Sequence, residues 1–294
     1  MSARRRTVRS GGLDLNVLVE GDGPAIVFLH GGGLTAHTWR RVVADLARDH
    51  RCVAVDLRGH GDSDWSPSAD YTLTSMAADL RTVVAELGIA RPHLVGMSLG
   101  GQVALHAVCH GFAARSLALV DVGPRLLQRP DNPIRTFMRT HSYPSFDAAL
   151  DAAAEFRPDR DRASLASSLR RSMRPAGDGS WSWKWDPARR DSYAERSAEA
   201  RALTGLLGAV SCPVLVVRGA RSPVFGAADA RRLVVALPRA RLETLDAGHD
   251  VQSERPAELA ALIRAFHEED PDAPCGPPAG AGGPHGQAGQ GISS

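Results

Sequence analysis

The feature that most constrains this chain is a Gly-x-Ser-x-Gly motif, which lies between an apolar run and a helix-like segment. The motif occupies residues 96–100 and is centred on Ser98. The apolar residues 93–97 predict a buried strand, and residues 102–110 predict a helix. A sharp strand-to-helix turn holds a serine in a strained conformation with its Oγ exposed, and the flanking glycines let the two elements approach closely. The pattern favours Ser98 as a nucleophile over an ordinary turn residue.

The rest of the chain alternates short apolar runs with segments of helical spacing. We expect strands at residues 8–20, 24–29, 52–55, 93–97, 116–120, 213–217 and 241–245. We expect helices at residues 38–48, 74–87, 102–110, 227–237 and 255–268. Short apolar strands that alternate with helices are typical of a parallel sheet covered on both faces. The sequence therefore predicts an α/β fold with a mostly parallel sheet of the eight-stranded type.

Changes of composition divide the chain into three parts. Residues 1–124 and 206–268 carry the alternating pattern and are predicted to form one core. Residues 125–205 contain no clear strand, and a structureless loop of that length is rare in a compact domain, so we predict a helical cap inserted into the core. Residues 269–294 are rich in Pro and Gly and lack apolar periodicity, which predicts a disordered tail.

The predicted cap contains three of the five tryptophans of the chain, in the run Trp-Ser-Trp-Lys-Trp at residues 181–185. Two interpretations stay open for Trp183 and Trp185. They either pack the cap onto the core or line a substrate cavity. In the second case the substrate would be a moderately apolar small molecule.

Charge, hydropathy and cysteine spacing exclude several classes of protein. The net charge is only +2 and acidic residues are interleaved with basic ones, so we expect no nucleic-acid partner. No stretch approaches the roughly 20 apolar residues of a membrane span, and no apolar segment follows the basic start as in a secretory signal. The four cysteines lack metal-site spacing, and we expect no metal, no cofactor and a cytoplasmic location. A small-molecule substrate is the expected partner, and a homodimer stays open.

Two further segments supply the groups that a serine nucleophile needs. A His-Gly-Gly-Gly loop follows an apolar strand, and the backbone N–H group of Gly32, together with that of Leu99, is placed to form an oxyanion hole. His30 and Gly33 of the same loop are then expected at the substrate pocket. His249 follows the last predicted strand, and imidazole is the side chain whose pKa suits removal of the serine proton near neutral pH.

These motifs resemble successive signatures of the α/β-hydrolase superfamily, especially its small bacterial esterases, lactonases and carbon–carbon hydrolases. The resemblance rests on Leu-His-Gly-Gly-Gly at residues 29–33, Asp-Leu-Arg-Gly-His-Gly-Asp-Ser at 56–63, Gly-Met-Ser-Leu-Gly-Gly at 96–101 and Ala-Gly-His at 247–249. It extends from residue 8 to about residue 268 and implies the fold of that superfamily, with a cap. The branches of this fold that use an aspartate nucleophile, the epoxide hydrolases and dehalogenases, would need Asp in place of Ser98 and are excluded.

One position departs from the pattern of the superfamily, which usually carries an aspartate shortly after the strand at residues 213–217. This chain has Ser222 and Pro223 there. Asp121, directly after the preceding strand, is our candidate for the third catalytic residue, because some members of the superfamily carry the acid at that position. The alternative is that Asp121 only binds backbone N–H groups of its loop. Weaker candidates are Asp229, Asp246 and Asp250.

The sequence thus predicts a hydrolase of carboxylic esters or lactones that forms an acyl-Ser98 intermediate, with His249 as the base and Asp121 as its orienting acid. Two alternatives stay open. A carbon–carbon bond hydrolase, lyase or cyclase of secondary metabolism would use the Ser–His pair to move protons, and the missing aspartate favours it. A ligand-binding pseudo-enzyme would keep the pocket without turnover, although the retained Ser98 and His249 count against it.

Overall fold

An eight-stranded sheet forms the centre of the protein. The computed structural model describes residues 3–124, 137–158 and 160–269. Across the sheet the strands follow the order β1 (Arg4–Ser10), β2 (Leu13–Glu20), β4 (Arg51–Val55), β3 (Ala25–Leu29), β5 (His93–Met97), β6 (Ser116–Val120), β10 (Val214–Gly219) and β11 (Ala240–Leu245). The pairs β1–β2 and β2–β4 are antiparallel, and the other neighbouring pairs are parallel. The predicted α/β fold class is confirmed.

The first predicted strand is in fact two strands. We expected one strand over residues 8–20, but the chain reverses at Gly11 and Gly12, between β1 and β2. The φ angles of these glycines are 55° and 87°, a left-handed conformation that glycine adopts without a steric penalty. A Gly-Gly pair between alternating apolar residues is a hairpin signal, and the long strand prediction overlooked it.

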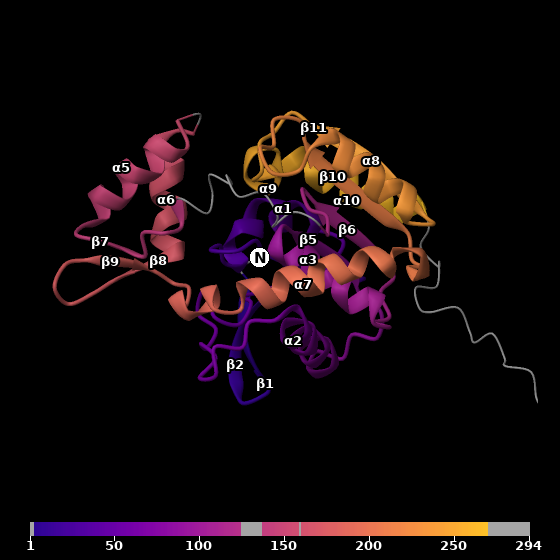
Figure 1. Cartoon of the computed structure of the whole chain (residues 1–294), viewed down its shortest axis with the longest axis horizontal. Coiled ribbons are helices and arrows are strands. Elements are labelled where there is room, and N and C mark those ends of the chain that lie inside the picture. The colour runs from indigo at the N-terminus through magenta and orange to yellow at the C-terminus, as the bar shows by residue number, and fades with distance from the viewer. Residues whose placement is uncertain (1–2, 125–136, 159, 270–294) are drawn as a thin grey trace, which may run out of the picture.

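Helices cover both faces of the sheet (Figure 1). The layer on one face comprises η1 (Ala36–Trp39), α1 (Arg40–Leu46), α9 (Val251–Glu254) and α10 (Pro256–Glu269). The layer on the other comprises α2 (Leu73–Glu86), α3 (Leu99–Cys109) and α8 (Ala227–Ala236). Within β3, Ile26 and Phe28 pack into the first layer. Val27 and Leu29 pack into the second. Both faces of the strand are buried, which explains why its sequence is apolar throughout.

Between β6 and β10 the chain builds a smaller unit beside the core (Figure 1). Its elements are β7 (Ser142–Tyr143), α5 (Phe146–Phe156), α6 (Arg162–Ser172), β8 (Met173–Pro175), β9 (Trp181–Trp183) and η3 (Pro187–Arg190). We expected helices only, but β7, β9 and β8 form a three-stranded antiparallel sheet. The Trp-Ser-Trp run forms β9, because alternating large and small side chains suit the period of two of a strand. We call this unit, from β7 to η3, the cap.

After the cap, the chain returns to the core through α7 (Tyr193–Ala202), η4 (Leu203–Gly205) and η5 (Leu207–Ala209). In Figure 1, α7 crosses in front of the core. The Glu199 carboxylate on α7 accepts hydrogen bonds from the backbone N–H groups of Leu73 (2.6 Å) and Thr74 (3.2 Å), at the start of α2. These bonds satisfy N–H groups that a helix N-terminus leaves without partners, so α7 is tied to the core.

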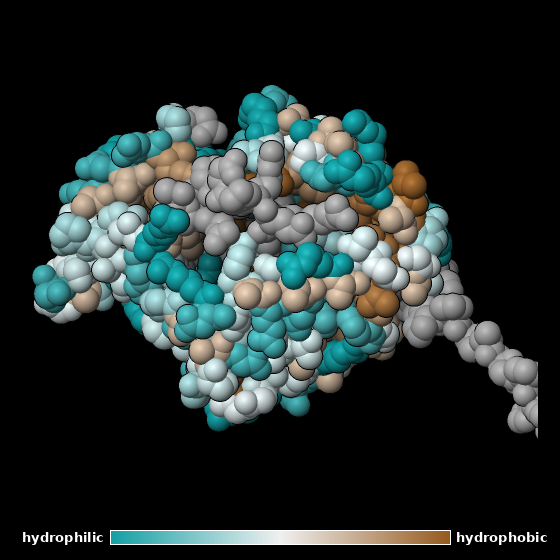
Figure 2. Space-filling view, in the orientation of Figure 1, coloured by the Kyte–Doolittle hydropathy of each residue, from teal (hydrophilic) through white to brown (hydrophobic). Residues whose placement is uncertain are grey.

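The visible surface of the protein is mainly hydrophilic. Hydrophilic residues dominate the face shown in Figure 2, and hydrophobic residues form only small separate areas on it. Of the helices in the described part of the chain, none is long and apolar enough to span a bilayer. The predicted tail lies, from residue 270 onward, outside the described residues, as do residues 125–136 of the predicted insertion.

Candidate active site

Ser98 occupies the tight turn between β5 and α3. Its φ and ψ angles are 50° and −116°, a left-handed conformation that costs a residue other than glycine about 1–3 kcal/mol. The glycines of the motif are needed because the chain is crowded there. A Cβ atom on Gly100 would lie 2.2 Å from the Leu29 carbonyl oxygen, and one on Gly96 would lie 2.5 Å from the carbonyl oxygen of Gly100. The turn therefore sets Ser98 at the carboxyl end of β5, where parallel sheets present their ligand sites.

His249 and Asp121 meet at the same edge of the sheet. Asp121 follows β6, and His249 lies between β11 and α9. The His249 Nδ1 donates to the Asp121 Oδ2 over 2.6 Å. Because a carboxylate only accepts hydrogen bonds, this contact fixes the proton on Nδ1 and leaves Nε2 to act as a base. Ser98 and His249 line the same cavity.

Asp121 is held by more than the histidine. Its side chain is fully buried, and its φ angle is 50°. Its Oδ1 accepts the N–H group of Gly219 at 2.9 Å, and its Oδ2 accepts the hydroxyl of Ser222 at 2.5 Å. The Ser222 Oγ in turn accepts the N–H groups of Val224 (3.3 Å) and Phe225 (3.2 Å), so the hydroxyl proton is directed at Asp121. After β10, where the superfamily usually carries an aspartate, this chain thus has Ser222, whose hydroxyl donates a hydrogen bond to Asp121 after β6.

The sequence did not predict a role for Ser222. It showed only that Ser222 stands where an aspartate is usual. We expect Ser222→Ala to lower kcat/KM roughly ten-fold. A hydrogen bond to a charged group contributes about 1.5–3 kcal/mol, and only part of this energy affects the orientation of His249 by Asp121. Ser222→Thr, which keeps the hydroxyl, should restore most of the activity. In an Asp121→Asn background Ser222→Ala should change kcat/KM little, and additive losses in that double-mutant cycle would contradict a role through Asp121.

The other aspartates considered from the sequence are engaged by arginines. The ion pairs are Asp250 with Arg157, Asp229 with Arg232, and Asp246 with both Arg221 and Arg255. None of the three is recorded as a hydrogen-bond partner of His249 within the described residues.

The glycine loop after β3 lies against the start of α3. The N–H group of Gly100 donates to the His30 carbonyl oxygen at 3.0 Å, which joins the loop to the helix. A Cβ atom built on Gly32 would lie 3.9 Å from the Leu99 Cδ2, so the two residues expected to form the oxyanion hole are neighbours beside Ser98. Gly33 has a φ angle of 80° and faces the cap, because a Cβ atom there would lie 3.9 Å from the Trp185 Cδ1 and 2.2 Å from the Cε of Met138, which precedes the cap.

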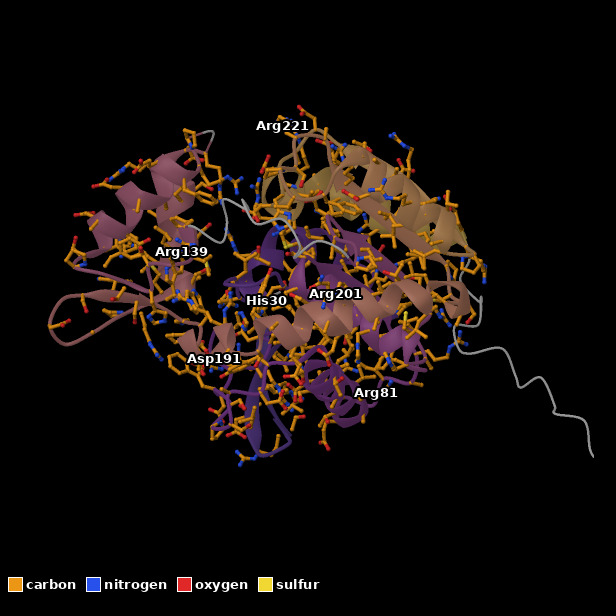
Figure 3. All side chains as sticks on the ribbon, viewed as in Figure 1. His30, Arg81, Arg139, Asp191, Arg201 and Arg221 are labelled. Carbon is orange, nitrogen blue, oxygen red and sulfur yellow. The ribbon has the colours of Figure 1, made fainter. Side chains whose placement is uncertain are left out.

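His30 does not line the cavity, contrary to the expectation from the sequence. Its side chain is buried, with Nδ1 donating to the Gly31 carbonyl oxygen (2.8 Å) and Nε2 accepting the N–H group of Leu57 (3.0 Å). Figure 3 labels His30 near the middle of the view, and its side chain has no exposed surface. Burial lowers the pKa of His30, and the neutral ring fixes the path of the glycine loop.

The motif at residues 56–63 also has a structural role. The Asp56 carboxylate accepts the N–H groups of Ala36 (2.6 Å) and Asp62 (2.9 Å). The His60 Nδ1 donates to the Arg58 carbonyl oxygen at 3.0 Å, and its Nε2 accepts a hydrogen bond from Arg189 of the cap. Burial and the charge of Arg189 hold the pKa of His60 well below its usual value, so the ring is a neutral acceptor near pH 7.

A cavity of about 1110 Å³ lies between the core and the cap. Ser98, His249 and the glycine loop line it on the core side, and Trp183 and Trp185 line it on the cap side. The Trp183 Nε1 donates to the Thr140 carbonyl oxygen, and both tryptophans also belong to the apolar cluster of the cap. They therefore both pack the cap and face the cavity. Within the described residues, no group of three His, Cys, Asp or Glu side chains is arranged to hold a metal ion.

Comparison with known proteins gives consistent matches over this architecture. The model of a family described as the alpha/beta hydrolase family matches residues 26–262. The esterase Rv0045c of Mycobacterium tuberculosis is 32% identical over 254 residues, which is 83% of each chain. A solved structure of that esterase has a TM-score of 0.75 at 30% identity and covers 91% of this chain and 93% of its own. An α/β hydrolase structure from Novosphingobium aromaticivorans has a TM-score of 0.76 at 26% identity, over 91% of this chain and 99% of its own.

Proposed function

This chain belongs to the α/β hydrolase family, and from that premise we propose that it is a serine hydrolase of carboxylic esters or lactones of small, moderately apolar molecules. The observation that carries the proposal is the hydrogen bond of 2.6 Å between His249 and the buried Asp121. It supplies an oriented base that lines the same cavity as Ser98, at the carboxyl ends of the strands. The similarity to an M. tuberculosis esterase supports the choice of an ester.

In the proposed reaction the Ser98 Oγ attacks the carbonyl carbon of the ester while its proton passes to the His249 Nε2. The N–H groups of Gly32 and Leu99 bind the oxyanion of the tetrahedral intermediate. When the intermediate collapses, the bond to the leaving oxygen breaks and His249 returns the proton to the alcohol. A water molecule, deprotonated by His249, then attacks the acyl-Ser98 ester, and the acid is released with Ser98 restored.

The absence of an acid after β10 was the reason to consider carbon–carbon bond chemistry. The Asp121–His249 hydrogen bond counts against that chemistry, because it gives His249 a carboxylate partner in place of the aspartate absent after β10. A pseudo-enzyme would not need a histidine oriented by a buried carboxylate. Ester or lactone hydrolysis is therefore the function that the arrangement supports best.

The test is a substrate comparison with the full chain. We expect hydrolysis of para-nitrophenyl esters, with kcat/KM highest at a short or medium acyl chain, because Trp183 and Trp185 bound the cavity. The panel includes a lactone, and a diketone substrate serves as the probe of carbon–carbon cleavage. Diketone cleavage without hydrolysis of any ester or lactone would contradict the proposal, as would the absence of all turnover.

A further inference from the structure

The cavity carries a surplus of positive charge. Seven arginines line it within the described residues, against three acidic side chains, Glu155, Asp250 and Glu254. Two of those acids are already paired, because Arg157 binds both Asp250 (2.5 Å) and Glu254 (2.7 Å). Arg221 also pairs with Glu254, at 3.2 Å, and within the described residues the other five lining arginines form no ion pair with these three acids. Figure 3 shows two of the seven, Arg139 on the side of the cap and Arg221 on the side of the core.

Arg189 lies against the glycine loop that contains Gly32. It is the third residue of η3, and its Nη2 lies 3.5 Å from the position that a Cβ atom of Gly32 would occupy. Its guanidinium donates to the neutral His60 ring and lies over the ring of Trp185, 4.7 Å from the ring centroid. Neither contact neutralises the charge. Within the described residues, Arg189 forms no ion pair with a carboxylate.

Within the described residues, neither of the two acids close in sequence, Asp186 and the exposed Asp191, forms an ion pair with Arg189. The Asp186 carboxylate accepts the Tyr71 hydroxyl and, at 2.9 Å, the N–H group of Ala188. A second cation lies next to Arg189, because the buried Arg196 donates to the Arg189 carbonyl oxygen at 2.9 Å. Burial and the charges of Arg196 and Arg190 lower the pKa of Arg189 to about 9. Buried charge without a counter-ion is costly, and a bound anion would relieve that cost.

We infer that Arg189 binds a carboxylate on the acid portion of the substrate, so that the natural ester or lactone carries a negative charge a few bonds from the scissile carbonyl. The inference rests on the proposed function, which puts that carbonyl at the N–H groups of Gly32 and Leu99. A planar guanidinium suits this task, because its donors match the two oxygens of a carboxylate. Trp183 and Trp185 line an apolar part of the same cavity.

The experiment compares two esters that differ by one group. Monoethyl succinate carries an anionic oxygen where ethyl levulinate, its neutral counterpart, carries a methyl group, and both release ethanol. We expect the wild type to favour the anionic ester roughly 10–100-fold in kcat/KM, the range of a charge-assisted hydrogen bond. Arg189→Met should abolish the preference and keep kcat/KM on ethyl levulinate within a few fold of the wild type. Arg189→Lys keeps the charge but not the paired N–H donors of the guanidinium, so its preference for the anionic ester should be intermediate.

Arg174→Met is the matched control. Arg174 is exposed on β8 of the same cap and also lies over an aromatic ring, that of Trp65, but it does not line the cavity. Removing it changes the net charge equally, and the preference should survive. Equal losses on both esters in Arg189→Met would assign Arg189 to the oxyanion instead and overturn the inference, as would a wild type without preference.

A binding measurement separates this inference from the proposed function. In the Ser98→Ala variant, which cannot form the acyl intermediate, calorimetry should show tighter binding of monoethyl succinate than of ethyl levulinate. The difference should disappear when Arg189→Met is added. A wild type that hydrolyses neither ester, combined with this binding preference in the variant, would contradict the proposed function and support the anion site. Equal binding of the two esters would refute the anion site alone.

Discussion

The Ser98→Ala variant is expected to hydrolyse para-nitrophenyl butyrate with a kcat lower by about a million-fold, the loss found when the nucleophile of a serine protease is removed. Ser98 lines the cavity from a strained turn, and the oriented imidazole of His249 lines the same cavity. The residual rate would come from the oxyanion donors Gly32 and Leu99. The unfolding temperature should stay close to that of the wild type, since within the described residues no hydrogen bond of the Ser98 hydroxyl is recorded.

The measurement is kcat from initial rates of nitrophenolate release, with the unfolding temperature recorded for each variant. Ser253→Ala is the control, because Ser253 lies on α9, just beyond His249, and does not line the cavity. It should keep the rate of the wild type. If Ser98→Ala kept more than a few per cent of the wild-type kcat, Ser98 would not be the nucleophile.

Replacing Asp121 with asparagine is expected to lower kcat by about ten-thousand-fold, the loss found for this change in another triad. The Asp121 carboxylate accepts from three donors, and an amide has only one acceptor oxygen to offer them. Its NH₂ group would favour the tautomer of His249 that carries the proton on Nε2, which cannot take the serine proton. KM should change far less than kcat, because Asp121 is buried and does not line the cavity.

Asp246→Asn is the matched control for this prediction. Asp246 is three residues from His249 in the sequence but pairs with Arg255 and Arg221 on the surface. Its loss should change kcat by less than a few fold, because exposed ion pairs contribute only about 0–1 kcal/mol. Similar kcat values for Asp121→Asn and the wild type would mean that Ser98 and His249 act as a dyad.

The parts of the site that the sequence predicted are those with a local pattern. Ser98 and the glycine loop lie in local motifs, and some of the close contacts that require glycine span only a few residues of chain, such as Gly96 against Gly100. Asp121 was predicted less directly, from the absence of an acid after β10 and from the position of the acid in some members of the superfamily. That it meets His249 depends on a contact across 128 positions of sequence, which no local pattern encodes.

The parts that were missed depend on long-range contacts or on competing patterns. Arg189 and Arg196 have no sequence signature, because arginine is abundant in this chain and only the fold separates cavity arginines from surface ones. The role of Ser222 depends on a hydrogen bond from its hydroxyl to Asp121, which lies 101 positions away in the sequence. His30 was assigned to the pocket because of its neighbours, although a buried imidazole can equally hold a loop through its two nitrogens.

Covalent acylation of Ser98 is tested by the mass of the protein after reaction with a para-nitrophenyl ester and a rapid acid quench. The proposed mechanism predicts a wild-type species heavier by one acyl group, with the added mass confined after proteolysis to the peptide that contains Ser98. The Ser98→Ala variant should show no such species. Steady turnover of the ester without any acylated protein, or an acyl group on a different residue, would contradict the mechanism.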